Sequence, residues 1–182
     1  MQSKAGAKVI LTKRNVNNVI NRLAHEIIES IPDYQNVAFI GIVSGGIPIA
    51  EKTAAAIKRF EGISIPIGQL DVSFYRDDLQ IKKEQVAVRE TSIPCDLHQK
   101  DVILFDNVIC SGRTIRAAMD ALLDWGRPKS IKLAVLIDRE HREFPIQANF
   151  VGKKIATERN DLVVTNFEES ENVVILIENQ KK

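Results

Sequence analysis

The chain has 182 residues, enough for one domain with its own core, and its 45% hydrophobic and 27% charged residues are typical of a globular protein. A net charge of +1 excludes a general attraction to nucleic acid or anionic membranes, so such binding requires a local cationic patch. The two cysteines, Cys95 and Cys110, lack the spacing of a zinc site, and no apolar run is long enough to span a membrane. We therefore expect a single domain over residues 1–182 in a reduced, cytoplasmic setting.

The first half of the sequence alternates between helical and strand-like patterns. Thr12 is expected to cap a helix, because apolar residues recur at helical spacing from Val16 to Ile31 and Pro32 follows them. The next expected elements are a strand at residues 37–42, a small-residue turn at 44–46 and a helix at 48–60. A second strand at 64–72 and a loop or long hairpin tip at 73–86 follow.

The second half continues this alternation. Its expected elements are a strand at residues 102–105, a loop at 106–112 and an amphipathic helix at 115–123. Another strand at 131–137 and two short final strands at 161–166 and 172–177 follow. Such alternation predicts an α/β fold with a mostly parallel sheet covered on both faces by helices. Ligands of these sheets bind beyond the carboxyl ends of the strands. The candidate ligand loops are therefore residues 43–46, 73–86, 106–114 and 138–148.

The segment Val102–Thr114 combines an apolar strand, an acidic residue and a small-residue turn that opens a helix. Backbone N–H groups at a helix start bind phosphate, and Gly112 permits a close approach of the backbone. Asp106 can accept hydrogen bonds from a sugar diol, while Ser111 and Thr114 can donate to a phosphate. The segment therefore fits a ribose 5-phosphate. An ordinary capped helix after a strand fits the same residues, and neither a P-loop nor a GxGxxG fingerprint is present.

Val102–Thr114 resembles the phosphoribosyl-pyrophosphate (PRPP) motif of type I phosphoribosyltransferases, and more closely that of the PyrR family of pyrimidine-operon regulators and uracil phosphoribosyltransferases. Four further stretches are similar to this family: Arg22–Ile27, Asp71–Leu79, Gly126–Ile131 and Leu136–Pro145. The resemblance covers about residues 9–178, in order. It implies a type I phosphoribosyltransferase fold, in which a mostly parallel twisted sheet flanked by helices carries a small hood and a flexible loop.

The resemblance implies a PRPP site at the carboxyl end of the sheet. Asp106 would contact the ribose hydroxyls and would be catalytic together with Arg76, whose flexible loop would close over the site. The pyrophosphate would be lined by Ser44, Gly45 and Gly46. The other implied PRPP-binding residues are Asn107, Cys110, Ser111, Gly112, Arg113 and Thr114.

The resemblance also implies a base site and a reaction. Uracil would be held, largely through backbone groups, by the loop residues Asp138, Arg139, Glu140, His141 and Arg142. A ring nitrogen of uracil would displace pyrophosphate from C1 of the ribose of PRPP, giving UMP. Mg²⁺ would accompany the pyrophosphate, ligated by substrate oxygens and water rather than directly by the protein. No residue is required as a covalent nucleophile, so the protein would act by positioning and electrostatics.

A second implied activity is the regulation of pyrimidine genes by transcription attenuation. The protein would bind leader mRNA in response to uridine nucleotides such as UMP and UTP, as a homodimer or homotetramer. The cationic positions that match the RNA-binding face are Arg22, His25, Arg142 and Lys153. Arg22 and His25 lie three residues apart on the polar side of the first helix, where a solvated helix face is the simpler interpretation of the pattern alone.

The chain departs from the family pattern at several of these positions. Asn107 replaces a second acid and Gly45 replaces an arginine, and each lost charge-assisted contact contributes roughly 1.5–3 kcal/mol, or about 10- to 100-fold in rate or affinity. Glu140 replaces a glycine. Asn21 and Gln147 replace a threonine and an arginine, which weakens the attraction to RNA phosphates. Two alternatives therefore remain: an RNA-binding regulator with weak or no catalysis, and a phosphoribosyltransferase for another base.

Overall fold

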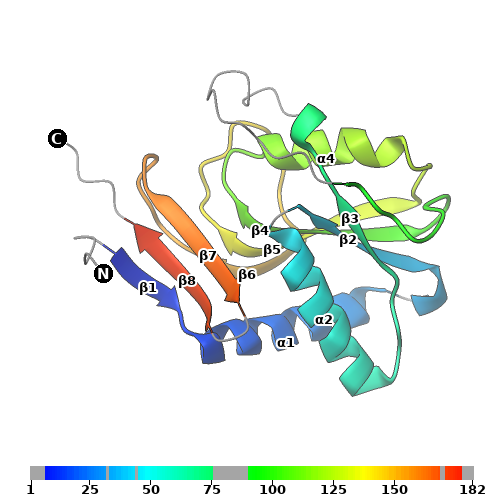
Figure 1. Ribbon diagram of the computed structural model, residues 1–182, viewed down its shortest axis with the longest axis horizontal. Coiled ribbons are helices and arrows are strands. Elements are labelled where there is room, and N and C mark those ends of the chain that lie inside the picture. The colour runs from blue at the N-terminus through cyan, green and yellow to red at the C-terminus, as the bar shows by residue number, and fades with distance from the viewer. Residues whose placement is uncertain (1–6, 32, 44, 76–89, 169–170, 178–182) are drawn as a thin grey trace.

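A five-stranded parallel sheet forms the centre of the protein. The computed structural model describes residues 7–31, 33–43, 45–75, 90–168 and 171–177 (Figure 1). The strand order of the central sheet is β3-β2-β4-β5-β6, and every neighbouring pair is parallel. These strands span Ile67–Leu70 (β3), Val37–Ile42 (β2), Asp101–Ile109 (β4), Ser130–Asp138 (β5) and Phe150–Lys154 (β6). The expected α/β sheet is confirmed.

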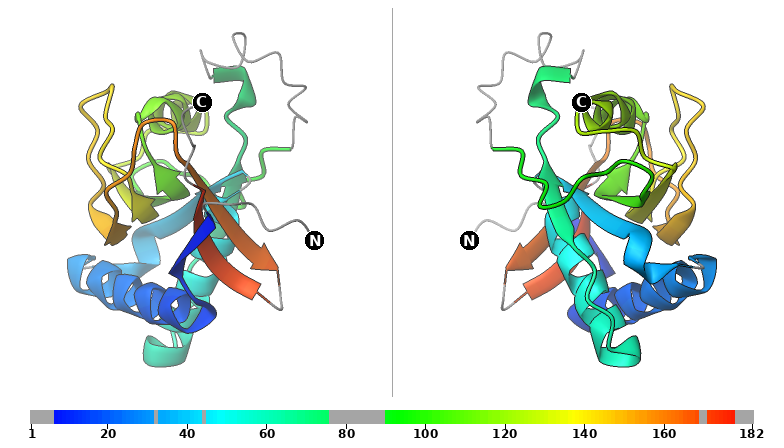
Figure 2. Two further views of the ribbon diagram at one scale, coloured as in Figure 1. Left: turned by 90° about the vertical axis from the view of Figure 1, so that its left-hand side faces the viewer. Right: turned by 90° about the vertical axis from the view of Figure 1, so that its right-hand side faces the viewer.

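Helices cover both faces of this sheet. Helices α1 (Lys13–Ser30) and α2 (Gly46–Glu61) pack on one face, while α4 (Arg113–Leu123) covers the other (Figures 1 and 2). All six residues of β2 are buried, as expected for a strand with helices on both sides. Two 3-10 turns, η1 (Tyr34–Asn36) and η2 (Ser73–Tyr75), complete the helical elements of the described chain.

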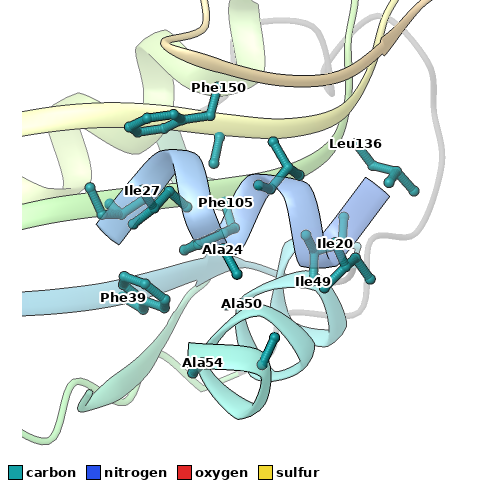
Figure 3. Packing of buried hydrophobic residues seen from close by; sticks show 14 of the residues in the cluster. Ile20, Ala24, Ile27, Phe39, Ile49, Ala50, Ala54, Phe105, Leu136 and Phe150 are labelled. Carbon is teal, nitrogen blue, oxygen red and sulfur yellow. The ribbon is translucent and has the colours of Figure 1, made fainter. Parts of the chain in front are cut away.

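The larger core lies between the sheet and the pair α1 and α2. Figure 3 shows Phe39 of β2 and Phe105 of β4 facing the apolar side chains of both helices, and the centroids of the two rings are 4.8 Å apart. Burying such a ring contributes roughly 1.5–3 kcal/mol relative to leaving it exposed. A second cluster lies under α4 and includes Leu104, Ile115 and Leu122. The apolar runs of the sequence therefore fix the position of each helix on the sheet.

Local signals set the boundaries of the helices. The Thr12 side chain accepts a hydrogen bond from the backbone N–H of Asn15, and the Asn15 side chain accepts one from the backbone of Thr12. This reciprocal capping box confirms the expected start of α1. Helix α2 ends at Gly62, which has φ 72°, a left-handed conformation that favours glycine.

A small antiparallel sheet forms the expected hood. Its order is β1-β8-β7, with β1 at Ala7–Leu11, β7 at Leu162–Glu168 and β8 at Glu171–Ile177. The arrowheads of β4 and β5 point toward this hood (Figure 1). The carboxyl ends of the central strands and the hood therefore enclose the region in which a ligand of this fold is expected.

The structure also corrects several sequence-based expectations. The expected strand 64–72 is only Ile67–Leu70, and β4 runs on to Ile109 although a loop was expected from residue 106. Strands β1 and β6 were not expected, because neither five-residue segment has a clear apolar alternation. Of the expected loop 73–86, the described part forms the turn η2, and residues 76–86 lie outside the described chain. Among the described helices, none has the length and apolarity to cross a membrane.

Candidate active site

The segment Val102–Thr114, called the PRPP segment for its resemblance to the PRPP motif, joins β4 to the first turn of α4. Asp106 is 6% exposed, and its Oδ1 accepts a hydrogen bond from the backbone N–H of Asn107 at 2.8 Å. Gly112, the residue before α4, has φ 92° and makes no side-chain cap, so the first turn keeps backbone N–H groups without intrahelical acceptors. The Ser111 hydroxyl accepts a hydrogen bond from the N–H of Arg113 at 3.4 Å. This arrangement suits an anion at the start of α4.

The turn before α2 approaches β4 so closely that only glycine fits. A Cβ atom on Gly46 would lie 2.0 Å from the carbonyl oxygen of Phe105, and one on Gly45 would lie 2.3 Å from Cγ of Asn107. The backbone of the turn therefore lies directly beside the end of β4, next to Asp106. Asn107 and Gly45 are both departures from the family pattern. They depend on each other in this chain, because the side chain of Asn107 fills the space that a side chain at position 45 would need.

The side chain of Asn107 connects the central sheet to the hood. Its Nδ2 donates to the hydroxyl of Thr165 on β7 at 2.8 Å, and its Oδ1 accepts from the N–H of Val108 at 2.9 Å. Sequence reasoning missed Thr165, which lies 58 residues away and belongs to no recognisable motif. The amide at position 107 thus holds the hood at the edge of the PRPP segment.

The loop after β5 is held by one arginine. Arg142 donates to the carbonyl oxygens of Cys110 and Ile146 at 2.9 and 2.8 Å, and to Oδ2 of Asp138 at 2.7 Å. The backbone N–H groups of Glu143 and Phe144 donate to the carbonyl of Ser111 at 2.9 and 3.0 Å. The expected base-binding loop and the expected phosphate loop are therefore joined into one unit.

The five expected base-binding residues separate into two groups. Asp138, Glu140 and Arg142 line a pocket of about 420 Å³, together with residues of the same loop and Lys154. Arg139, which is 8% exposed, instead donates to the Thr157 hydroxyl, and Nε2 of His141 lies 2.8 Å from the Thr157 carbonyl oxygen. The structure thus brings the first group together and directs the second toward the segment between β6 and β7.

Glu140 has a left-handed backbone, with φ 61°. This conformation costs a non-glycine residue roughly 1–2 kcal/mol and is the reason that glycine suits the position. Its N–H donates to Asp138 Oδ1 at 2.9 Å, and its carboxylate pairs with the exposed Lys154 at 3.3 Å. The loop therefore retains the backbone shape that a glycine would allow.

A carboxylate that sequence reasoning missed stands beside the start of α4. Glu143 accepts hydrogen bonds from Arg159 and, at 2.8 Å, from Nε of Arg113. These two partners hold the pKa of Glu143 below its ordinary value, with Arg159 as the larger cause. The guanidinium of Arg113 also lies over the ring of Phe144, 5.2 Å from its centroid. Arg113 is thereby oriented at the start of α4.

The turn η2 is fixed to α4 at the point where the chain enters the expected flexible loop. The hydroxyl of Tyr75 donates to Asp124, a hydrogen bond that raises the pKa of Tyr75, and Arg116 donates to the Tyr75 carbonyl oxygen at 3.1 Å. The expected catalytic residue Arg76 follows directly but lies outside the described chain, as does Ser44 of the pyrophosphate turn.

The four expected RNA-binding residues differ in how much of their charge faces solvent. Arg22 donates to the carbonyls of Val151 and Gly152, the latter at 2.5 Å, and pairs with Glu26. Arg142 is engaged in the loop contacts described above. His25 and Lys153 are exposed. Lys153 Nζ also donates to the Ile10 carbonyl oxygen at 3.4 Å, and the ring of His25 stacks on Phe60, so each of the four residues makes a contact within the protein that the sequence did not indicate.

Comparison with known proteins places this geometry in a family. Residues 6–171 match the model of the phosphoribosyl transferase domain. "Bifunctional protein PyrR" of Deinococcus deserti is 49% identical over 164 residues, 90% of each chain, and that of Chloroflexus aurantiacus is 48% identical over 91% of each. A hypoxanthine phosphoribosyltransferase structure from Staphylococcus aureus superposes with a TM-score of 0.71 at 21% identity, covering 95% of this chain and 93% of that one. The chain belongs to the phosphoribosyl transferase domain family, and within that family to the PyrR proteins.

Proposed function

We propose that the protein is a cytoplasmic uracil phosphoribosyltransferase that also regulates pyrimidine genes by binding leader mRNA. The observation that carries the enzymatic part is the first turn of α4, which begins after Gly112 without a side-chain N-cap, beside the buried carboxylate of Asp106. Backbone donors at the helix start suit the 5-phosphate of PRPP, while the carboxylate suits the ribose hydroxyls. The Gly45–Gly46 turn supports a pyrophosphate position, because it lies beside the end of β4 and opens α2, where backbone N–H groups can bind phosphate.

In the proposed reaction, N1 of uracil forms a bond to C1 of the ribose as the bond from C1 to the pyrophosphate oxygen breaks. The leaving electron pair stays on pyrophosphate, and the N1 proton passes to solvent. Positive charge develops on the ribose in the transition state, and the negative charge of Asp106 favours it. The loop around Asp138 would hold the base, and Arg142 would fix that loop against Cys110 so that base and ribose are correctly oriented.

The donor groups of the site fit Mg²⁺ carried by pyrophosphate. This cation prefers oxygen ligands and retains several waters, so it needs few protein carboxylates. Asp106 supplies one carboxylate, the amide of Asn107 is engaged by Thr165 and Val108, and Gly45 and Gly46 of the neighbouring turn offer backbone groups. Asp106 would therefore hold the metal's water shell, and the metal would neutralise charge on the leaving pyrophosphate.

The enzymatic proposal is tested by UMP formation from uracil, PRPP and Mg²⁺. Asp106→Asn should lower kcat/KM about 10- to 100-fold, because one charge-assisted contact of roughly 1.5–3 kcal/mol is removed. Asn107→Asp is the matched variant: it keeps the size of the side chain and an acceptor for Val108, and it adds a charge. We expect it to raise activity. Absence of UMP formation in both the original protein and Asn107→Asp would refute the enzyme, and a preference for hypoxanthine or guanine would identify another base.

The regulatory proposal rests on the similarity to relatives named bifunctional and on the exposed side chains of His25 and Lys153. We expect specific binding to the organism's own pyrimidine leader RNA, strengthened by UMP or UTP, by a homodimer or homotetramer. A gel-shift titration at several salt concentrations measures this binding. Affinity no greater than for a scrambled RNA of equal length would refute regulation by leader binding and leave the enzyme proposal untouched.

A further inference from the structure

A groove of about 320 Å³ runs between α1 and α2. Its floor is apolar, with the buried side chains of Ile20 and Ala56. Its rim combines two amides from α1 with two cations from α2: Asn17, Asn21, Lys52 and Arg59. No carboxylate is among the described residues that line it. The groove thus offers an apolar surface, amide hydrogen-bonding groups and positive charge within one small volume.

One end of this groove carries a stack of planar groups. The ring of His25 lies parallel to that of Phe60, with centroids 4.5 Å apart and an interplanar angle of 11°. The guanidinium of Arg59 lies 4.7 Å from the centroid of Phe60, and its NH2 donates to Oδ1 of Asn21 at 2.9 Å. Although all three stacked residues are exposed, their contacts hold them in a defined arrangement. A flat, cationic and partly aromatic surface therefore adjoins the apolar floor.

The groove is continuous with the surface proposed to bind RNA. Asn17, Asn21 and His25 are spaced by four residues along α1 and so share one face of that helix. The site is also remote from the proposed reaction centre, because Arg59 lies 13 residues beyond Gly46, or about 20 Å along α2 at 1.5 Å per residue. Changes to the cations of the groove should therefore leave UMP formation intact.

We infer that this groove binds a nucleotide of single-stranded RNA, an inference that rests on the regulatory part of the proposed function. Lys52 and Arg59 contact phosphates, and a base lies on the floor with its edge toward the amides of Asn17 and Asn21. Proteins recognise single-stranded RNA by stacking bases on aromatic rings or guanidinium planes and by hydrogen bonds to base edges. A volume near the lower limit of ligand pockets suits one nucleotide rather than a duplex. The two cations also add to the positive charge of Arg22 and Arg142, whose guanidinium groups donate to backbone carbonyl oxygens.

The experiment measures the affinity of the full-length protein for single-stranded pyrimidine leader RNA across a salt series. Each phosphate neutralised on a single strand contributes about 0.7 to the slope of log K against log salt. The double variant Lys52→Gln/Arg59→Gln should therefore lower the magnitude of this slope by about 1.4 and weaken binding at least about tenfold. Arg59→Lys retains the charge but loses the planar group, so it should keep the slope and still weaken binding. Lys58→Gln, which removes an exposed cation outside the groove on the same helix, is the matched control.

The outcomes separate the inference from the function on which it rests. If the original protein binds the leader and the double variant binds with equal affinity and slope, the groove is not a nucleotide site, while regulation by RNA stands. If Lys58→Gln weakens binding as much as the double variant, the effect is general charge and the inference is overturned. If the original protein shows no preference for the leader, both fail together. A changed molecular mass of the double variant in light scattering would assign the groove to a subunit interface instead.

Discussion

Replacing Arg142 with alanine should destabilise the protein rather than merely remove an RNA contact. Its side chain is 22% exposed, and it donates three hydrogen bonds, one of them to Asp138, whose side chain is 5% exposed. Truncation leaves that carboxylate buried without its cation, a change that costs about 3–5 kcal/mol. At roughly 2–4 °C per kcal/mol for a chain of this size, the melting temperature should fall by about 6–20 °C.

Calorimetry or a circular-dichroism melt measures this effect, with Lys153→Ala as the control. Lys153 belongs to the same proposed RNA surface but is exposed, so its removal should change stability by no more than about 0.5 kcal/mol. The double variant Asp138→Asn/Arg142→Gln should recover part of the loss, because no unpaired charge remains buried. A melting temperature of Arg142→Ala within about 3 °C of the original would refute the structural role, particularly if RNA affinity alone declined.

Three further changes test other parts of the structure. Gly46→Ala places a Cβ atom 2.0 Å from the Phe105 carbonyl oxygen, so the turn must shift; we expect a loss of about 3 kcal/mol in a denaturant melt and a raised KM for PRPP, and unchanged values would contradict the close approach. Glu140→Gly should raise stability by about 0.5–1 kcal/mol by relieving the left-handed backbone, whereas Glu140→Ala should not. Because its folded pKa is lowered, Glu143 contributes stability that is present above its ordinary value of 4.5 and lost as pH falls through the lowered value. The melting temperatures of the original protein and Glu143→Gln should therefore converge on acidification, and a constant difference down to the acid limit would contradict this linkage.

The parts of the fold that sequence reasoning predicted depend on local patterns. The stripe of α1 follows Thr12 at helical spacing, and the run Val102–Phe105 has the continuous apolar character of a buried parallel strand. Gly112 was expected where the backbone must open a phosphate loop, and it has the positive φ that this role requires. Such features are encoded within a few neighbouring residues, so they can be recognised without knowledge of the tertiary structure.

The features that were missed depend on residues distant in the sequence. Thr165 reaches Asn107 because the chain returns in β7 to the end of β4, and no local sequence pattern predicts that contact. Arg142 was expected in the base-binding loop and on the RNA-binding face, and its contact with the Cys110 carbonyl oxygen was not foreseen. Strand β1 has a mixed composition and is stabilised by pairing with β8 rather than by its own propensity.

The pairing of β1 with β8 has a consequence for the order in which the protein is made. Ala7 pairs with Ile177, so the first described strand finds its neighbour only after nearly the whole chain has left the ribosome. All strand pairs of the central sheet lie within β2 to β6, whereas the hood that carries Thr165 needs β8 between β1 and β7. A chain that stops short of β8 would therefore lack the partner of β1 and β7, and with it Val174 of the larger core.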